Sequence, residues 1–384
     1  MSETATVEDM EQPIASDVGH PEGTGRLRKF WDACIKLQAS DMLCRPGNKV
    51  KFRLRGQLRD ADAPPFTEEE VEREVKWILS PEQWAHYHRA GSVDLAYKHD
   101  ENNRFRVNIF RTMGRSAIAA RRISSDIKNF EQLYLPTVLG DVTKHIQGLV
   151  LLSGVTGSGK STTIAAMLEK VNSERQCHIV TIEDPIEFMF RDNKALINQR
   201  EIGVDVPNFH EALRSLVREN PDVVLIGEMR DRETIEAALH ASETGHLVFG
   251  TVHASSCSQC FSRIYNLFPE EERSLIRELL GQQLQCIVYQ RLLRTLIPDV
   301  PRVPAVEVML ANTVVRKYIF DGREAELGDV IVKCEGEGMI SFNSSLVDSV
   351  NKEYIHPKVA LEAARNPEEL KMRLKGIRTG TQKE

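Results

Sequence analysis

The sequence predicts an α/β protein in which helices surround a mostly parallel sheet, with a smaller α+β unit before it and short helices after it. Four short apolar runs have the length and composition of buried parallel strands, namely residues 149–152, 179–182, 223–226 and 247–249. Helical patterns lie between these runs, such as the one formed by Phe209, Leu213 and Leu216. Repeated strand-then-helix order implies right-handed crossovers within one sheet.

The α+β unit is predicted over residues 26–136. It opens with apolar side chains at helical spacing in residues 27–37. Thr67, with Glu70 three residues later, is typical of a helix N-terminus with a capping box. Alternating apolar positions indicate strands at residues 50–54, 105–110 and 116–123.

The remaining boundaries follow from composition. Residues 1–25 contain six acidic residues and no Lys or Arg, and are predicted to be a disordered acidic tail. The α/β core is expected over residues 137–296, a C-terminal helical region over 297–374 and a second tail over 375–384. Within the helical region, amphipathic helices are expected near residues 314–320, 342–350 and 367–374.

Composition excludes several classes of protein. Hydrophobic residues make up 41% of the 384 residues and charged residues 28%, as in ordinary globular proteins. No apolar run approaches the roughly 18 residues of a membrane span, and no signal peptide is recognised, so we expect no transmembrane segment. The net charge of −6 argues against a chain that coats nucleic acid. Seven scattered cysteines do not indicate a disulfide framework.

A glycine-rich loop follows the first apolar run. Residues 154–161 read Gly-Val-Thr-Gly-Ser-Gly-Lys-Ser and fit the P-loop pattern in full. Glycines let backbone N–H groups turn around a phosphate, and the following helix directs its positive end at the same anion. Lys160 adds a charge for the β- and γ-phosphates, and Ser161 adds a hydroxyl ligand for Mg²⁺. A chance glycine-rich turn is the alternative, but both flanking elements also fit. The predicted ATP-binding residues are Gly154, Thr156, Gly157, Ser158, Gly159, Lys160, Ser161 and Thr162.

Acidic and histidine residues follow the other apolar runs. The run at 223–226 leads to Glu228, the arrangement expected of Walker B, whose strand end would lie beside the P-loop. The run at 179–182 leads into three carboxylates ending at Glu187, which is either a solvated turn or the base for a hydrolytic water. His253 follows the fourth run, where it has either a structural role or a place facing the γ-phosphate.

These motifs together resemble the secretion ATPases of type IV pili, and most closely the retraction motors of the PilT/PilU group. The resemblance spans roughly residues 27–377 and is carried by the P-loop, the acidic box at 181–187, the Asn-Gln-Arg-Glu run at 198–201, the Walker B run at 223–231 and the histidine box at 243–253. It implies a PAS-like N-terminal domain joined to a RecA-like core, assembled as a hexameric ring that binds ATP and Mg²⁺.

The resemblance also implies roles for individual residues. Glu187 would be the general base, Glu228 the Walker B carboxylate at Mg²⁺ and His253 a sensor of the γ-phosphate. Arginines of the N-terminal domain, Arg104 and Arg106 among them, would complete a nucleotide site. Six arginines lie within residues 104–122 with no acid among them, so a solvated basic face or an RNA-binding patch is the alternative.

The function implied is ATP-driven retraction of type IV pili, which produces twitching motility. The implied partners are further copies of this chain and an inner-membrane pilus platform protein, with a second pilus motor ATPase left open and no nucleic acid expected. The implied location is cytoplasmic, at the inner face of the cytoplasmic membrane. The alternatives are a secretion or nucleic-acid-translocating ATPase, a PilU-like accessory motor and a nucleotide-gated scaffold. The retraction motif Ala-Ile-Arg-Asn-Leu-Ile-Arg-Glu is only partly matched at 314–321, where its final Arg-Glu is lost.

Overall fold

A computed structural model describes residues 25–54, 56–100 and 103–376, which form two compact units. The first unit contains the described residues up to Asp126, together with residues 185–189 and 200–208. The second unit contains residues 127–184 and 190–199 and the described residues from Phe209 onward. The tails predicted at 1–25 and 375–384 lie almost wholly outside the described residues.

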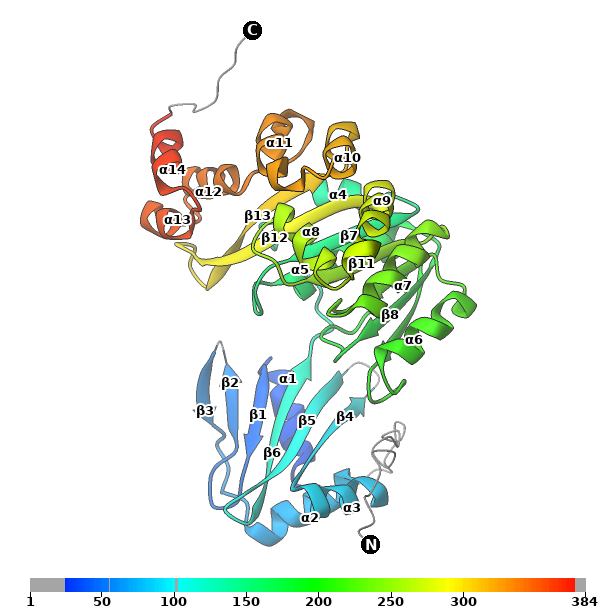
Figure 1. Cartoon of the computed structure of the whole chain (residues 1–384). Coiled ribbons are helices and arrows are strands. Elements are labelled where there is room, and N and C mark those ends of the chain that lie inside the picture. Colours follow the sequence, from blue (N-terminus) through cyan, green and yellow to red (C-terminus); the bar gives the residue numbers. More distant parts are fainter. Residues whose placement is uncertain (1–24, 55, 101–102, 377–384) are drawn as a thin grey trace, which may run out of the picture. The chain divides into compact units, whose positions relative to one another are not determined.

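The first unit is an antiparallel sheet with three helices, as predicted for an α+β unit (Figure 1). The sheet has the strand order β3-β2-β1-β6-β5-β4. Its strands are β1 (Asp41–Cys44), β2 (Lys51–Leu54), β3 (Gln57–Asp60), β4 (Ser92–Asp100), β5 (Asn103–Thr112) and β6 (Arg115–Ile123). The helices are α1 (Arg28–Lys36), α2 (Glu68–Ile78) and α3 (Pro81–Ala90). Buried side chains of α1, α2 and the sheet form one hydrophobic core around Trp31 and Phe105.

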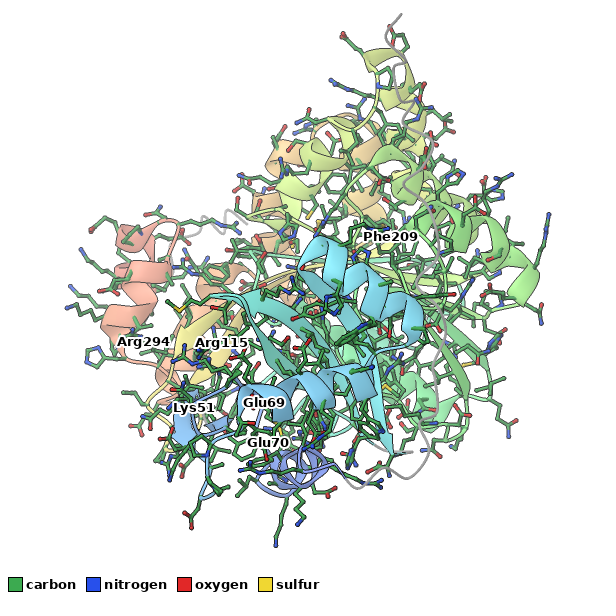
Figure 2. The ribbon with its side chains drawn as sticks, turned by 90° about the horizontal axis from the view of Figure 1, so that it is seen from below. Lys51, Glu69, Glu70, Arg115, Phe209 and Arg294 are labelled. Carbon is green, nitrogen blue, oxygen red and sulfur yellow. The ribbon has the colours of Figure 1, made fainter. Side chains whose placement is uncertain are left out.

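Local sequence signals account for several of these elements. The capping box predicted for α2 is present, because the Thr67 hydroxyl accepts from the Glu70 N–H while the Glu70 carboxylate accepts from the Thr67 N–H. Glu69 and Glu70 both lie in the first turn of α2, which is acidic (Figure 2). Strands β5 and β6 form a hairpin whose two-residue turn has positive φ at Met113 and Gly114.

The second unit is built on a seven-stranded sheet with the order β13-β12-β7-β11-β10-β8-β9. Strands β12, β7, β11, β10 and β8 are parallel neighbours. Four of them, β7, β8, β10 and β11, correspond to the four predicted apolar runs. The strands are β7 (Gly148–Ser153), β8 (His178–Glu183), β9 (Leu196–Glu201), β10 (Val223–Ile226), β11 (Leu247–Val252), β12 (Leu284–Arg294) and β13 (Arg302–Leu310). Strand β11 lies between β7 and β10, so the Walker B strand is not the direct neighbour of the P-loop strand.

Helices cover both faces of this sheet (Figure 1). On one face, α4 (Val138–Val142) and α5 (Lys160–Glu174) bury apolar side chains against Val150 and Leu152 of β7. Side chains of a strand alternate between faces, so Leu149 and Leu151 point the other way. There α6 (Phe209–Leu216), α7 (Arg232–Glu243), α8 (Cys257–Tyr265) and α9 (Arg273–Gln283) follow one another along the chain, and α7 and α9 contact β7.

The C-terminal region is not purely helical, which corrects the sequence prediction. Strand β13 lies inside residues 297–374 and pairs antiparallel with β12, so the sheet continues past residue 296. Strand β12 was not predicted either, because Gln285, Gln290 and Arg291 interrupt its apolar residues. The helices of this region are α10 (Thr313–Phe320), α11 (Leu327–Lys333), α12 (Phe342–Asn351), α13 (Pro357–Ala363) and α14 (Pro367–Leu374), and three of them match the predicted positions. Within the described ranges, no helix has the length and apolar character that a membrane span requires.

Candidate active site

The P-loop connects β7 to α5 through a backbone that only glycine adopts without strain. Gly154, Gly157 and Gly159 have φ values of 143°, 76° and 89°. A Cβ atom on Gly157 would meet nothing within 4 Å, so this part of the loop faces open space. Helix α5 begins at Lys160, and Ser161 and Thr162 lie in its first turn. The N–H groups of that turn lack partners within the helix, which makes the turn an anion-binding end.

Lys160 is held against the loop that it follows. Its side chain is buried, and its Nζ donates to the carbonyl oxygens of Gly154 at 2.9 Å and Val155 at 3.3 Å. A buried ammonium group is tolerated only with such partners. The loop therefore keeps a positive charge beside the backbone N–H groups that a phosphate would contact.

Strand pairing brings the other predicted residues of the second unit to the same edge as the P-loop. Ser153, the last residue of β7, pairs with Val252 of β11, so His253 directly follows the residue opposite the start of the loop. Gly250 of β11 pairs in turn with Ile226, the last residue of β10. This is the carboxyl edge of the parallel strands, where open α/β sheets bind ligands.

Glu228 and His253 meet at this edge. His253 Nε2 lies 2.9 Å from Glu228 Oε1, and Arg230 donates to Glu228 Oε2. The hydrogen bond from Arg230 is the main cause that lowers the pKa of Glu228, while partial burial opposes it and His253 adds to the lowering. Glu228 is therefore ionised at neutral pH. Thr251 holds the two strand ends together, since its hydroxyl donates to the Gly227 carbonyl at 2.7 Å.

The acidic box is divided between the two units. Glu183, at the end of β8 in the second unit, is buried and accepts hydrogen bonds from Thr181 at 2.6 Å and Gln199 at 3.1 Å. Glu187, the residue predicted to be the base, belongs to the first unit and is exposed. Of the three carboxylates predicted in this turn, Glu183 is buried and hydrogen-bonded, while Asp184 and Glu187 are exposed.

Arg104 and Arg106 lie on one face of β5 in the first unit, while Phe105 between them enters the core. Arg104 Nη2 lies 3.9 Å from Glu201 Oε2, a side chain with 8% exposure. Burial raises the pKa of Glu201, and the charges of Arg104 and Arg106 lower it. This group of charges was not predicted as a unit, although Glu201 lies in the Asn-Gln-Arg-Glu run.

The other arginines of the basic run have local partners in the first unit, which accounts for them without RNA. Arg121 pairs with Asp41 and Arg115 with Glu68, both at 3.0 Å. Arg111 lies 2.8 Å from His88 Nδ1, and the side chain of Arg122 donates to a backbone carbonyl.

The donors available for Mg²⁺ are oxygen atoms, as this hard cation requires. Ser161 offers a hydroxyl at the start of α5, and Glu228 offers an ionised carboxylate at the same sheet edge. The chemistry of this donor set fits the predicted metal. Among the described residues, no group of three or more His, Cys, Asp and Glu side chains forms a separate metal site.

The family described as Type II/IV secretion system protein matches residues 27–347. The type IV pilus retractation ATPase PilT of Pseudomonas aeruginosa is 38% identical over 333 residues, which cover 87% of this chain and 96% of that protein. The type IV pilus ATPase PilU of the same organism is 31% identical over 350 residues, covering 91% of each chain. A crystal structure of the pilus retraction motor PilT with bound ADP has a TM-score of 0.82 and 35% identity, and covers 90% of this chain and 98% of that one.

The fold and the site define a P-loop ATPase, an enzyme that hydrolyses ATP. The chain belongs to the Type II/IV secretion system protein family, and among its relatives are the pilus motors PilT and PilU.

Proposed function

We propose that this protein is the motor ATPase that powers type IV pilus retraction, and hence twitching motility, as a ring of six copies. The main support is the meeting of Glu228 and His253 at the sheet edge from which the P-loop begins. The chain is similar to PilT over 96% of that protein's length, and this similarity supports the pilus as the structure on which the motor acts.

The residues of the second unit would bind and orient the nucleotide. The backbone N–H groups of the loop from Gly154 to Thr162 would donate hydrogen bonds to the phosphates. The ammonium group of Lys160 would contact the oxygens of the β- and γ-phosphates. Mg²⁺, held by Ser161 and Glu228, would neutralise charge on the phosphates. His253, in contact with Glu228, would sense the γ-phosphate and relay its presence to the Walker B strand.

The residues of the first unit would complete the reaction. Glu187 would accept a proton from the attacking water. Arg104 and Arg106 would supply positive charge to a nucleotide site as arginine fingers, which links turnover to ring assembly. We further propose that the ring works at the inner face of the cytoplasmic membrane, where it acts on the inner-membrane pilus platform protein.

A PilU-like accessory role is the second candidate, because PilU matches this chain over 91% of its length. The two roles differ in what a cell does without the protein. Deleting the gene for a retraction motor leaves cells that are piliated but do not twitch, and the wild-type gene restores twitching while a Lys160→Ala gene does not. A deletion strain that twitches normally contradicts the motor proposal, and one that twitches only under low load supports the accessory role.

A second experiment tests the ring. Mass and ATPase activity are measured together over a range of protein concentrations, with and without DNA. We expect specific activity to rise as hexamers form and to be unchanged by DNA. Activity that is independent of assembly contradicts the role given to the arginines, and activity that DNA stimulates in a salt-sensitive way supports a translocase.

A further inference from the structure

Gln290 of β12 lies beside the P-loop, and both ends of its carboxamide make hydrogen bonds. The residue is 2% exposed. Its Nε2 donates to the Ser158 carbonyl at 2.8 Å, and its Oε1 accepts from the Thr163 hydroxyl at 2.8 Å. Ser158 belongs to the P-loop and Thr163 to the first turns of α5. One side chain therefore bonds both to the loop and to the helix that the loop begins.

The glycines of the loop are adapted to this residue. A Cβ atom on Gly154 would lie 2.4 Å from the Gln290 carbonyl oxygen, and one on Gly159 would lie 2.7 Å from Gln290 Nε2. A Cβ atom on Gly157 would meet nothing within 4 Å. Gly159 thus allows the loop to approach the amide of Gln290, and Gly154 allows it to approach the backbone of the same strand. Gly157 faces the side where a phosphate would enter.

The hydrogen bonds of Gln290 have few substitutes. Thr163 is 1% exposed, so water is largely excluded from this contact. Within the described part of the chain, the neighbouring Ser158 Oγ is buried and has no hydrogen-bond partner. If Gln290 lost its amide, the Ser158 carbonyl and the Thr163 hydroxyl would be left buried and unsatisfied, which is costly.

We propose that Gln290 is a positioning residue for nucleotide binding, which holds the P-loop open in the shape that receives phosphate. The hydrogen bond to the Ser158 carbonyl keeps that oxygen turned toward β12, and the N–H group of Gly159, on the other side of the same peptide, then points away from β12. The bond from Thr163 fixes the start of α5 relative to the same side chain. This proposal rests on the nucleotide site assigned to residues 154–162, and it adds a residue outside that motif.

The test compares two glutamines of the same strand. Gln290→Met removes the amide at nearly constant volume, and Gln285→Met makes the same change at a residue whose amide donates to the Gln147 carbonyl away from the loop. The affinity of the full-length protein for a fluorescent ADP analogue is titrated with MgCl₂ and again with EDTA. We expect Gln290→Met to weaken ADP binding about tenfold or more in both conditions, as the loss of a buried hydrogen bond implies. Gln285→Met should stay within about twofold of wild type.

The second half of the test changes Thr163, the other partner in the hydrogen bond. It remains informative even if Gln290→Met does not fold. Thr163→Val should weaken ADP binding severalfold, and Thr163→Ser, which keeps the hydroxyl, should restore it. In the double variant Gln290→Met/Thr163→Val, binding should be no weaker than in Gln290→Met alone, because the two groups act through one hydrogen bond. Melting temperatures without nucleotide separate a loss of loop shape from a loss of fold.

Each result bears on a separate claim. ADP affinity within twofold of wild type in Gln290→Met overturns the proposal, as does equal weakening by Thr163→Val and Thr163→Ser. Lys160→Ala is the reference for the nucleotide site itself. If Lys160→Ala leaves ADP binding intact, the site assigned to residues 154–162 fails, whereas normal binding in Gln290→Met alone overturns only the role of Gln290.

Discussion

His253 Nε2 and Glu228 Oε1 lie 2.9 Å apart and join the ends of two neighbouring parallel strands. The Thr251 hydroxyl and the Gly227 carbonyl, at 2.7 Å, make a second link between the same strands. We therefore expect a displacement of His253 to shift Glu228, the carboxylate proposed to bind Mg²⁺.

Replacing Lys160 should abolish turnover without unfolding the protein. Its Nζ is the buried positive charge of the P-loop, so Lys160→Ala should lower kcat/KM for ATP by about 100-fold or more. Lys170→Ala, which removes an exposed ion pair with Glu174 from the same helix, is the control and should change little. Steady-state phosphate release and circular dichroism measure the two effects. A Lys160→Ala protein with the parent rate would contradict the assignment of the loop.

Replacing Glu187 should separate binding from chemistry. Glu187→Gln keeps the shape of the side chain but cannot accept a proton, so we expect kcat to fall by about 10²–10⁴-fold while ATP binding stays within a few fold. Asp184→Asn changes an exposed carboxylate of the same acidic box and should keep most of the activity. Single-turnover phosphate release distinguishes the variants. Equal effects of the two substitutions would mean that charge in this turn matters, and not a base at Glu187.

Replacing Arg230 should move the acid limit of activity to higher pH. The hydrogen bond from Arg230 lowers the pKa of Glu228 from its ordinary value of 4.5. The ionised form of Glu228 stabilises the native state above the ordinary pKa of glutamate, and this contribution is lost as pH falls through the lowered pKa. In Arg230→Ala the pKa returns toward 4.5, so activity and stability should both begin to fall at a less acidic pH. Profiles of kcat/KM and melting temperature over roughly pH 4–8 measure the shift. Superimposable profiles for Arg230→Ala and wild type would contradict the pairing.

Replacing Arg104 should reduce turnover only in assembled protein. An arginine finger contributes about 10³–10⁵ to the rate, so the hexamer of Arg104→Ala should lose a large part of its activity while binding ADP normally. Arg121→Ala is a matched control from the adjacent strand, since Arg121 is exposed and pairs with Asp41. Activity is measured against protein concentration for both variants. An equal loss in the two variants would point to a general effect of the basic hairpin.

Replacing Arg316 should destabilise the C-terminal part of the second unit. Its guanidinium donates to the carbonyls of Gly281, Gln282 at 2.8 Å and Leu284 at 2.8 Å, which end helix α9. Removing it leaves several carbonyls without partners, so we expect Arg316→Ala to lower the free energy of unfolding by about 2–4 kcal/mol. Lys317→Ala, an exposed neighbour, should change it by less than about 0.5 kcal/mol. Urea titrations provide both values, and similar midpoints for the two variants would exclude this role.

Parts of the structure that depend on nearby residues could be predicted from the sequence, and Arg316 is one residue that the sequence singled out. It is the arginine retained from the retraction motif at 314–321, and its guanidinium caps the end of α9. Predictions that depend on local chemistry were accurate, such as the capping box at Thr67 and the strands at 105–110 and 116–123, which form a hairpin. In these cases the residues that determine the geometry lie within a few positions of one another.

Features that depend on distant segments were not predictable in the same way. Strand β13 is a strand because β12 offers it an edge, and neither segment has a strong pattern of its own. The position of β11 between β7 and β10 follows from the order of the crossovers, which the motifs do not record. Gln290 escaped notice because its partners, Ser158 and Thr163, are more than 120 residues away, as the separations of 132 and 127 residues show. The only signal was a polar pair, Gln290 and Arg291, within an otherwise apolar segment at 287–293.

The two faces of β12 contact different parts of the second unit, because consecutive residues of a strand point in opposite directions. Gln290 reaches the loop, while Arg291 donates to the Ala363 carbonyl at 3.4 Å and the ring of Tyr289 lies 5.3 Å from that of Phe342. The strand pairs with β13 from Cys286 to Arg294, and with β7 as far as Tyr289. If β12 tilted beside the P-loop when nucleotide binds, Tyr289 and Arg291 would pass the movement to the last helices of the chain. These helices are the part of the described chain farthest in sequence from the P-loop.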